Sequence, residues 1–238
     1  MSGPGVRPAP GRRLALFDLD GTLLHGPSSE RRFAAWLFLH GHARATQAGA
    51  WLAQAAARAR RDGRHALRRD KAYVAGLDVD RVTELAAAHV DAVIGAGHLD
   101  ERVLRTLAAH RRAGDRCVLL SGTLQPLADV YATRLGLDAA IGSLAPVRDG
   151  RYAVGPPVRH PYGAAKREIA ERERVASGVA PADTVAYGDS AADRDVLAWA
   201  GTAVAVEPDR ALAAIAHERG WVVLRHARGS GVPSVAVG

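Results

Sequence analysis

The sequence predicts an α/β fold, a Rossmann-like parallel sheet flanked by helices, with an all-helical domain inserted after the first strand. After residue 97, apolar segments of strand length alternate with amphipathic segments of helical length, as in parallel βαβ units. Between residues 30 and 97 no strand pattern occurs, and apolar residues recur at helical spacing. Polar residues directly follow several apolar segments, as at the ligand-binding edge of open α/β sheets.

Length and composition indicate one large domain, or one core with a modest second domain. The chain has 238 residues, of which 48% are hydrophobic and 24% charged. Its formal charge of +7 would suit nucleic acid, but the arginines are scattered and only 5% of residues are aromatic. We interpret the charge as attraction for anionic small substrates and expect no nucleic-acid partner.

The cysteine content and the hydropathy of the chain indicate the cellular compartment in which the protein is expected. Cys117 is the only cysteine, so no intrachain disulfide can form, and its apolar neighbours favour a buried, inert thiol. The N-terminal segment lacks the apolar stretch of a secretory signal, and no apolar run reaches membrane-spanning length. We expect a cytoplasmic protein without a membrane partner, and the sequence leaves the oligomeric state open.

The expected domain boundaries follow the changes of pattern along the chain. Residues 1–10 and 227–238 are predicted to be flexible tails. A core domain is predicted over residues 11–25 and 98–226, and a helical cap domain over residues 26–97. Because the insertion follows a strand that ends in carboxylates, we expect it to cover the ligand-binding edge of the sheet.

The individual elements are predicted from periodicity and end signals. The cap contains helical patterns near residues 30–41, 51–63 and 80–93, and Asp80 is the expected N-cap of the last. The first strand begins at Leu14. Later helices are predicted over residues 100–113, 124–135, 163–174, 193–200 and 208–219. Later strands are predicted over residues 116–120, 139–141, 184–187, 202–206 and 221–224, with a hairpin turn at 148–152.

The first strand leads into a pair of carboxylates. Its apolar run ends at Asp18 and Asp20, and alternation along a strand points residues i and i+2 to the same side. Two carboxylates held close together are costly without a counter-charge, and hard divalent cations prefer oxygen ligands. The arrangement therefore suggests Mg²⁺, although Asp20 followed by Gly21 is also typical of an ordinary turn.

Two basic or hydroxyl-bearing sites lie at the start of later helices. Ser121-Gly122-Thr123 combines a hydroxyl, a small residue and a helix N-terminus, which suits an anion, although a plain helix cap is the alternative. Lys166 opens another predicted helix in a chain whose only other lysine is Lys71. A compact ammonium suits a crowded phosphate, and a solvated surface lysine is the alternative.

A second pair of carboxylates follows the predicted strand 184–187. Asp189 could add its oxygen to the cation held by the first pair, whereas Asp193 could also serve only as a helix N-cap. Together, the four sites bring carboxylates, a hydroxyl and an ammonium to one edge of the sheet. This combination suits phosphoryl transfer, in which positive groups spread the developing charge while a carboxylate attacks.

In this order the segments resemble the four motifs of haloacid dehalogenase-like (HAD) hydrolases. The matching residues are Asp18-Leu19-Asp20-Gly21-Thr22, Ser121-Gly122-Thr123, Lys166 and Gly188-Asp189-Ser190-Ala191-Ala192-Asp193. The helical insertion resembles the C1 cap of that superfamily. Within it the chain is most similar to subfamily IB, which includes phosphoserine phosphatases. That placement depends on Gly150-Arg151-Tyr152, Pro161-Tyr162-Gly163 and Lys166.

The resemblance implies roles for the acidic residues. Asp18 would be the nucleophile that forms an aspartyl-phosphate. Asp20 would protonate the leaving oxygen and later activate water. Mg²⁺ would lie between Asp18, the backbone carbonyl of Asp20 and Asp189.

The same resemblance implies a phosphate-binding set. Ser121 and the amide of Gly122 would bind phosphate oxygens, and Lys166 would neutralise them. Asp193 would support the site.

Two positions depart from the pattern of phosphoserine phosphatases. Their second motif usually has a glycine where this chain has Thr123, which we expect to support the site. In these enzymes a glutamate close after the first motif binds the substrate amine. Glu30 lies a few residues later than that position. Glu30 and His25 are therefore substrate-contact candidates, with a first-turn helix residue and a loop histidine as the alternatives.

The sequence thus predicts an enzyme, a Mg²⁺-dependent phosphatase that hydrolyses a small phosphorylated metabolite through an aspartyl-phosphate. Three alternatives stay open: a phosphoserine phosphatase specifically, a phosphotransferase to an alcohol, and a non-catalytic regulatory or binding protein on the same fold. A serine hydrolase is disfavoured because no Gly-x-Ser-x-Gly segment occurs.

Overall fold

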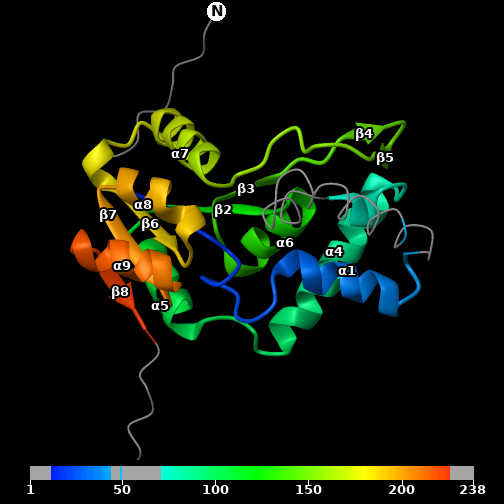
Figure 1. Ribbon diagram of the computed structural model, residues 1–238, viewed down its shortest axis with the longest axis horizontal. Helices are drawn as coiled ribbons and strands as arrows, with labels where there is room; N and C mark the ends of the chain where they lie inside the picture. The colour runs from blue at the N-terminus through cyan, green and yellow to red at the C-terminus, as the bar shows by residue number, and fades with distance from the viewer. Residues whose placement is uncertain (1–11, 44–48, 50–70, 226–238) are drawn as a thin grey trace, which may run out of the picture.

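A six-stranded parallel sheet forms the centre of the molecule (Figure 1). The computed structural model describes residues 12–43, 49 and 71–225. The strands run in the order β3-β2-β1-β6-β7-β8. Their bounds are β1 (Leu14–Phe17), β2 (Arg116–Leu124), β3 (Ala139–Ser143), β6 (Thr184–Gly188), β7 (Thr202–Val206) and β8 (Val222–Leu224). The predicted Rossmann-like α/β fold is confirmed.

Helices cover the sheet, and a short hairpin projects from it. The α-helices are α1 (Ser29–Leu39), α4 (Val79–Gly95), α5 (Glu101–Arg112), α6 (Gln125–Leu135), α7 (Ala164–Ser177), α8 (Arg194–Trp199) and α9 (Arg210–Glu218). The hairpin strands are β4 (Val147–Arg148) and β5 (Arg151–Tyr152), as the turn signal predicts. Single 3-10 turns are η2 (Ala72–Val74), η3 (Pro181–Asp183) and η4 (Ala191–Asp193).

The start of α4 differs from the prediction. Asp78, not Asp80, is the N-cap, and its carboxylate accepts hydrogen bonds from the N–H groups of Asp80 and Arg81. The predicted cap was wrong by two residues because Asp80 is itself an acidic residue of the first turn, where the helix dipole also favours negative charge.

Both faces of strand β1 are buried. Alternate residues of β1 enter different hydrophobic clusters: Ala15 and Phe17 pack with side chains of α5 and α6, and Leu14 and Leu16 with those of α7, α8 and α9. Each fully buried leucine or phenylalanine side chain contributes about 1.5–3 kcal/mol to the free energy of unfolding. The strand end at Phe17 is therefore held rigidly between the two layers.

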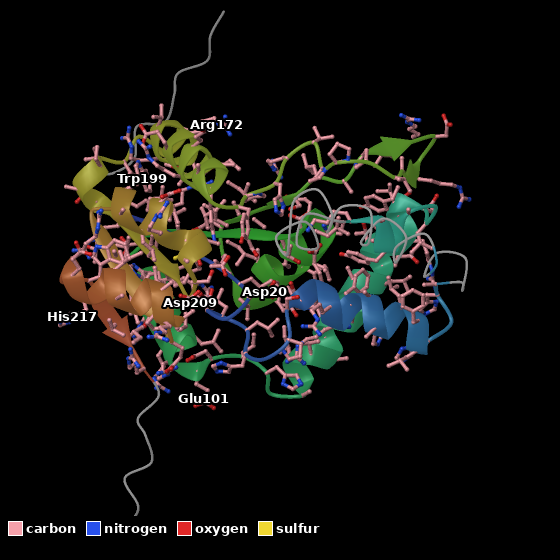
Figure 2. The ribbon with its side chains drawn as sticks, viewed as in Figure 1. Asp20, Glu101, Arg172, Trp199, Asp209 and His217 are labelled. Carbon is pink, nitrogen blue, oxygen red and sulfur yellow. The ribbon has the colours of Figure 1, made fainter. Side chains whose placement is uncertain are left out.

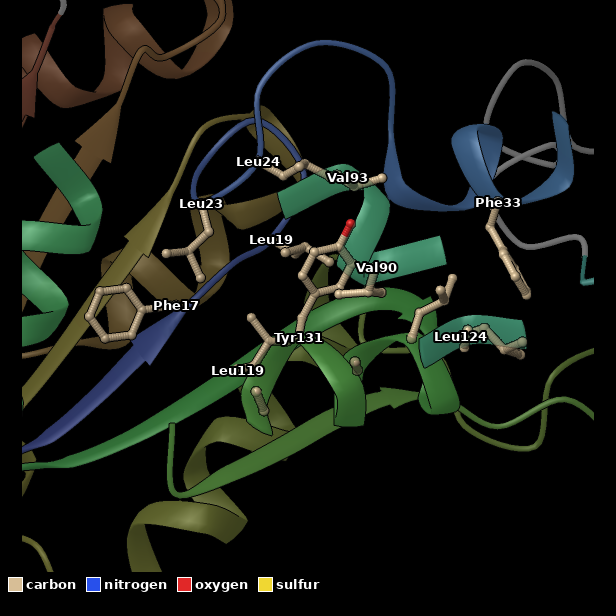
Figure 3. Close-up of a cluster of buried hydrophobic side chains, with 14 of the residues drawn as sticks. Phe17, Leu19, Leu23, Leu24, Phe33, Val90, Val93, Leu119, Leu124 and Tyr131 are labelled. Carbon is tan, nitrogen blue, oxygen red and sulfur yellow. The ribbon is translucent and has the colours of Figure 1, made fainter. Parts of the chain in front are cut away.

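The regular elements described between β1 and α5 are all helices. Within residues 26–43 and 71–97 the described elements are α1, η2 and α4, and α1 and α4 lie side by side (Figure 1). The helix expected near residues 51–63 lies outside the described residues. Val90 and Val93 of α4 pack near Tyr131 of α6, so one hydrophobic cluster joins the insertion to the core (Figure 3).

Membrane-spanning length is not reached by the helices that the structure describes. Among residues 12–43, 49 and 71–225, none of the helices is both long and apolar enough to cross a bilayer.

Candidate active site

The ends of three adjacent strands meet at one cavity. β1 pairs with β2 on one side and with β6 on the other, with Phe17 opposite Leu119 and Tyr187. The cavity has a volume of about 760 Å³. Its walls include predicted site residues from all four motifs, namely Asp18, Asp20, Ser121, Gly122, Lys166, Asp189 and Asp193. Asp20 lies near the middle of the molecule in Figure 2, whereas the labelled Arg172, Glu101 and His217 lie at its edges.

Three carboxylates and one ammonium form the most highly charged part of this cavity. Carboxylate oxygens of Asp18, Asp189 and Asp193 all lie within 4.8 Å of one another. Nζ of Lys166 donates to Oδ1 of Asp18 at 2.6 Å and to Oδ1 of Asp193 at 2.5 Å. The Lys166 side chain is only 5% exposed, so these charges interact with little screening by water.

This cluster fits a hard divalent cation. Three carboxylates face one ammonium, which leaves an excess of negative charge, and all the donors are oxygens of the kind that Mg²⁺ prefers. Burial raises the pKa of the Asp189 carboxyl to about 8, and the neighbouring carboxylates of Asp18 and Asp193 add to the increase. A bound cation would offset both effects, because positive charge favours the ionised carboxylate.

Without divalent cations, we expect the free energy of unfolding to fall as the pH rises. The pKa of Asp189 is about 8 in the folded chain against an ordinary value of 3.8, so the folded state binds this proton more tightly. The resulting stability is complete below the ordinary pKa and is lost as the pH rises through about 8, with a slope of at most about 1.4 kcal/mol per pH unit.

Urea unfolding in EDTA between about pH 5 and pH 8 measures this slope. Asp189→Asn, which cannot ionise at that position, should show a smaller slope than the unmodified chain. Parallel pH dependence of the two proteins would contradict the expectation.

A glycine makes room for Asp189. Gly21 has a φ of +86°, and a Cβ placed on it would lie 2.1 Å from Oδ2 of Asp189. The sequence Asp20-Gly21 is therefore more than a turn signal, since only a residue without a side chain lets the ends of β1 and β6 approach this closely.

Gly21→Ala should destabilise the protein and weaken Mg²⁺ binding, because the methyl group must displace the Asp189 carboxylate. Gly97→Ala is a matched control, since Gly97 has a φ of +74° but open space around its Cα. The control should lose only the free energy that a side chain costs in this left-handed backbone conformation, roughly 1–2 kcal/mol. Urea unfolding with and without Mg²⁺ measures the stability and the stabilisation by Mg²⁺. Equal losses of stability in the two variants would contradict a specific role for Gly21.

Asp20 faces a different set of groups from Asp18. Its Oδ1 accepts the N–H of Ser29 at 2.6 Å, and its Oδ2 accepts the Ser29 hydroxyl at 3.1 Å. The sequence predicts that the Asp18 and Asp20 side chains emerge together after the first strand. Both line the cavity, but the hydrogen bonds of the Asp20 carboxylate are to Ser29. β1 ends at Phe17 and the chain turns at once, with the Thr22 N–H donating to the Leu19 carbonyl, so strand alternation does not reach residue 20.

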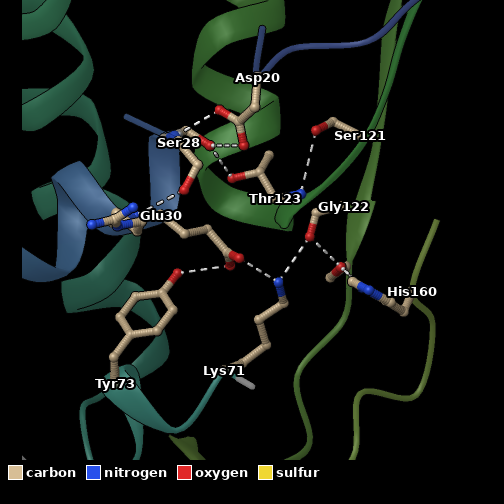
Figure 4. A network of polar contacts seen from close by, with 12 residues as sticks. Asp20, Ser28, Glu30, Lys71, Tyr73, Ser121, Gly122, Thr123 and His160 are labelled. Carbon is tan, nitrogen blue, oxygen red and sulfur yellow. Dashed lines mark hydrogen bonds and ion pairs between the residues drawn. The ribbon is translucent and has the colours of Figure 1, made fainter. Parts of the chain in front are cut away.

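Thr123 takes part in the same network. Its hydroxyl oxygen lies 2.8 Å from the Ser29 hydroxyl oxygen, within hydrogen-bond distance, and both side chains are buried (Figure 4). Thr123 thus contacts the first residue of α1, which in turn binds Asp20.

The two substrate-contact candidates are placed differently. Glu30 lines the cavity, and its carboxylate accepts hydrogen bonds from Lys71 and Tyr73 (Figure 4). His25 is not among the cavity-lining residues, and its Nε2 lies 3.4 Å from Oδ2 of Asp100.

Sequence reasoning missed three residues of this region: Ser29, Lys71 and Tyr73. Lys71 offered one signal, because it is one of only two lysines in an arginine-rich chain. Its partner Glu30 is 41 residues away, however, and no periodic pattern relates the two.

Comparison with known proteins assigns the family. Residues 15–198 match the model of the haloacid dehalogenase-like hydrolases. The chain belongs to this family, and the predicted membership is confirmed.

Relatives that match nearly the whole chain support the assignment. A putative hydrolase of Mycobacterium leprae is 30% identical over 97% of this chain and 81% of its own length. A phosphoserine phosphatase of Mycobacterium tuberculosis is 29% identical over 92% of this chain and 74% of its own length. Among solved structures, a Bordetella pertussis protein of unknown function has a TM-score of 0.74 and 26% identity, covering 90% of this chain and 98% of that chain. A substrate-bound phosphoserine phosphatase has the same fold, with a TM-score of 0.56 and 21% identity over 91% of this chain and 94% of that chain.

Proposed function

We propose that this protein is a Mg²⁺-dependent phosphatase that hydrolyses a small phosphomonoester through an aspartyl-phosphate. One observation supports the proposal most: Asp18 lies in a cluster with Asp189 and Asp193, bonded to Lys166, beside Ser121 in a single cavity. The family assignment and the relatives named phosphoserine phosphatase agree with this chemistry.

In the first step an oxygen of Asp18 attacks phosphorus, and the bond to the leaving oxygen breaks. Asp20 gives its proton to that oxygen. Burial raises the pKa of Asp20, while hydrogen bonds from Ser29 oppose the increase, so the carboxyl is better able to hold a proton than an exposed aspartate. In the second step water attacks phosphorus, Asp20 accepts the water's proton, and the Asp18 carboxylate is released with phosphate.

The remaining groups position the phosphate and balance its charge. The Ser121 hydroxyl and the Gly122 amide donate to phosphate oxygens. Lys166 stays charged, because Asp18 and Asp193 raise its pKa although burial acts to lower it. The carboxylates of Asp18 and Asp189 would hold Mg²⁺, which supplies positive charge against the developing negative charge of the phosphoryl group.

A phosphate-release screen tests the proposal. The purified protein is assayed with sugar, amino-acid, nucleotide and polyol phosphomonoesters, with Mg²⁺ or with EDTA. We expect release from at least one ester with Mg²⁺ and its loss with EDTA. Phosphorylated product formed from added alcohol, without free phosphate, would show a phosphotransferase instead. A folded protein inactive on the whole panel would contradict both.

A further inference from the structure

A second group of polar side chains lies where the leaving alcohol of a phosphate ester would sit. Glu30 of α1 and Tyr73 of η2 line the same cavity as Asp18 and Asp20. Glu30 directly follows Ser29, whose N–H and hydroxyl bind Asp20. Since Asp20 is the proposed acid for the leaving oxygen, groups attached to that oxygen come next to Glu30.

The Glu30 carboxylate is already held by buried donors. Its Oε2 accepts from Nζ of Lys71 at 2.6 Å, and its Oε1 accepts from the Tyr73 hydroxyl at 3.0 Å (Figure 4). Lys71 also donates to the carbonyl oxygen of Gly122 at 2.8 Å, which ties it to the core. The Lys71 side chain is 1% exposed, so separating it from Glu30 would break a buried ion pair, which is costly.

This pairing determines which leaving groups the cavity tolerates. A lone carboxylate would attract an ammonium, but an ammonium that approaches Glu30 here also approaches Lys71. Like charges a few ångströms apart repel strongly where water is excluded. A hydroxyl group meets no such repulsion, and it can donate to lone pairs that remain on the Glu30 oxygens.

We propose that the enzyme prefers phosphomonoesters whose leaving alcohol is uncharged and carries hydroxyl groups, and that it discriminates against leaving groups that bear an ammonium. This inference rests on the phosphatase activity proposed above. Serine carries an ammonium close to its phosphate-bearing oxygen, so O-phosphoserine belongs to the disfavoured class. The chain would then differ in substrate from its relatives named phosphoserine phosphatase.

A matched pair of esters tests the inference. 2-Hydroxyethyl phosphate and 2-aminoethyl phosphate differ only in a hydroxyl against an ammonium. For the unmodified protein with Mg²⁺, we expect kcat/KM to favour the hydroxyl ester by at least about tenfold, which corresponds to ~1.4 kcal/mol. Lys71→Met should reduce this ratio by about tenfold or more, because Glu30 then faces the substrate without the positive charge of Lys71 beside it. Lys71→Arg, which keeps the charge, should retain most of the ratio.

Other outcomes separate the inference from the proposed function. A preference for the aminoethyl ester, or a ratio unchanged in folded Lys71→Met, would overturn the inference while leaving the phosphatase intact. If Lys71→Met does not fold, Glu30→Gln replaces it. Lys71 would then repel the ammonium without the negative charge of Glu30 beside it, so the ratio should rise, and a fall would overturn the inference. Titration calorimetry of both esters with Asp18→Asn reports binding alone. A hydroxyl preference there without turnover by the unmodified protein would contradict only the proposed function.

Discussion

Replacing Asp18 with Asn should reduce phosphate release by at least about 10³-fold, because the amide is a poor nucleophile and the acyl-phosphate cannot form. The change is nearly isosteric, and the amide oxygen can still accept the hydrogen bond from Lys166 that the carboxylate accepts at 2.6 Å. We therefore expect a folded protein that has lost catalysis. Phosphate release at saturating substrate and Mg²⁺ measures the effect, and the melting temperature checks the fold.

Asp80→Asn is the matched control for this variant. Asp80 is exposed in the first turn of α4 and is not among the cavity-lining residues. It should leave the rate within about twofold of the unmodified protein, as is usual for surface changes. Asp18→Asn activity within tenfold of the unmodified protein would refute the proposed nucleophile, and equal losses in both variants would point to a general effect on the fold.

Lys166→Met should impair both stability and catalysis. The ammonium binds Asp18 and Asp193 in the interior, and its loss leaves their carboxylates facing Asp189 without a counter-charge. Removing one partner of a buried ion pair typically costs about 3–5 kcal/mol. The rate should also fall by at least about 10²-fold, because a preorganised positive charge on the phosphoryl group is lost.

The loss of stability should depend on pH and on metal. At low pH the carboxylates of Asp18 and Asp189, whose pKa values burial raises, take up protons and no longer repel one another. Urea unfolding in EDTA should therefore show a larger deficit for Lys166→Met near pH 8 than near pH 5, and Mg²⁺ should restore part of it. Arg167→Met, on the exposed face of the same helix, controls for losing a positive charge. A deficit independent of pH would argue against the electrostatic account.

The arrangement of the sheet could be predicted because its signals are local. Apolar runs of strand length alternate with amphipathic segments, and right-handed crossovers leave few ways to order such strands. The positions of Asp18 and Asp189 at neighbouring strand ends follow from the same pattern. Strand limits were less predictable: β2 continues to Leu124, through the segment interpreted as the start of a helix.

The class of fold, the four polar segments and the excess of acidic groups at one sheet edge could be predicted from the residues alone, because each depends on neighbouring residues. The contact of Asp20 with Ser29 and the pairing of Lys71 with Glu30 become visible only in the folded chain. The first depends on the backbone turn that follows the end of β1 at Phe17. The second depends on packing that brings together residues 41 positions apart, which no period in the sequence encodes.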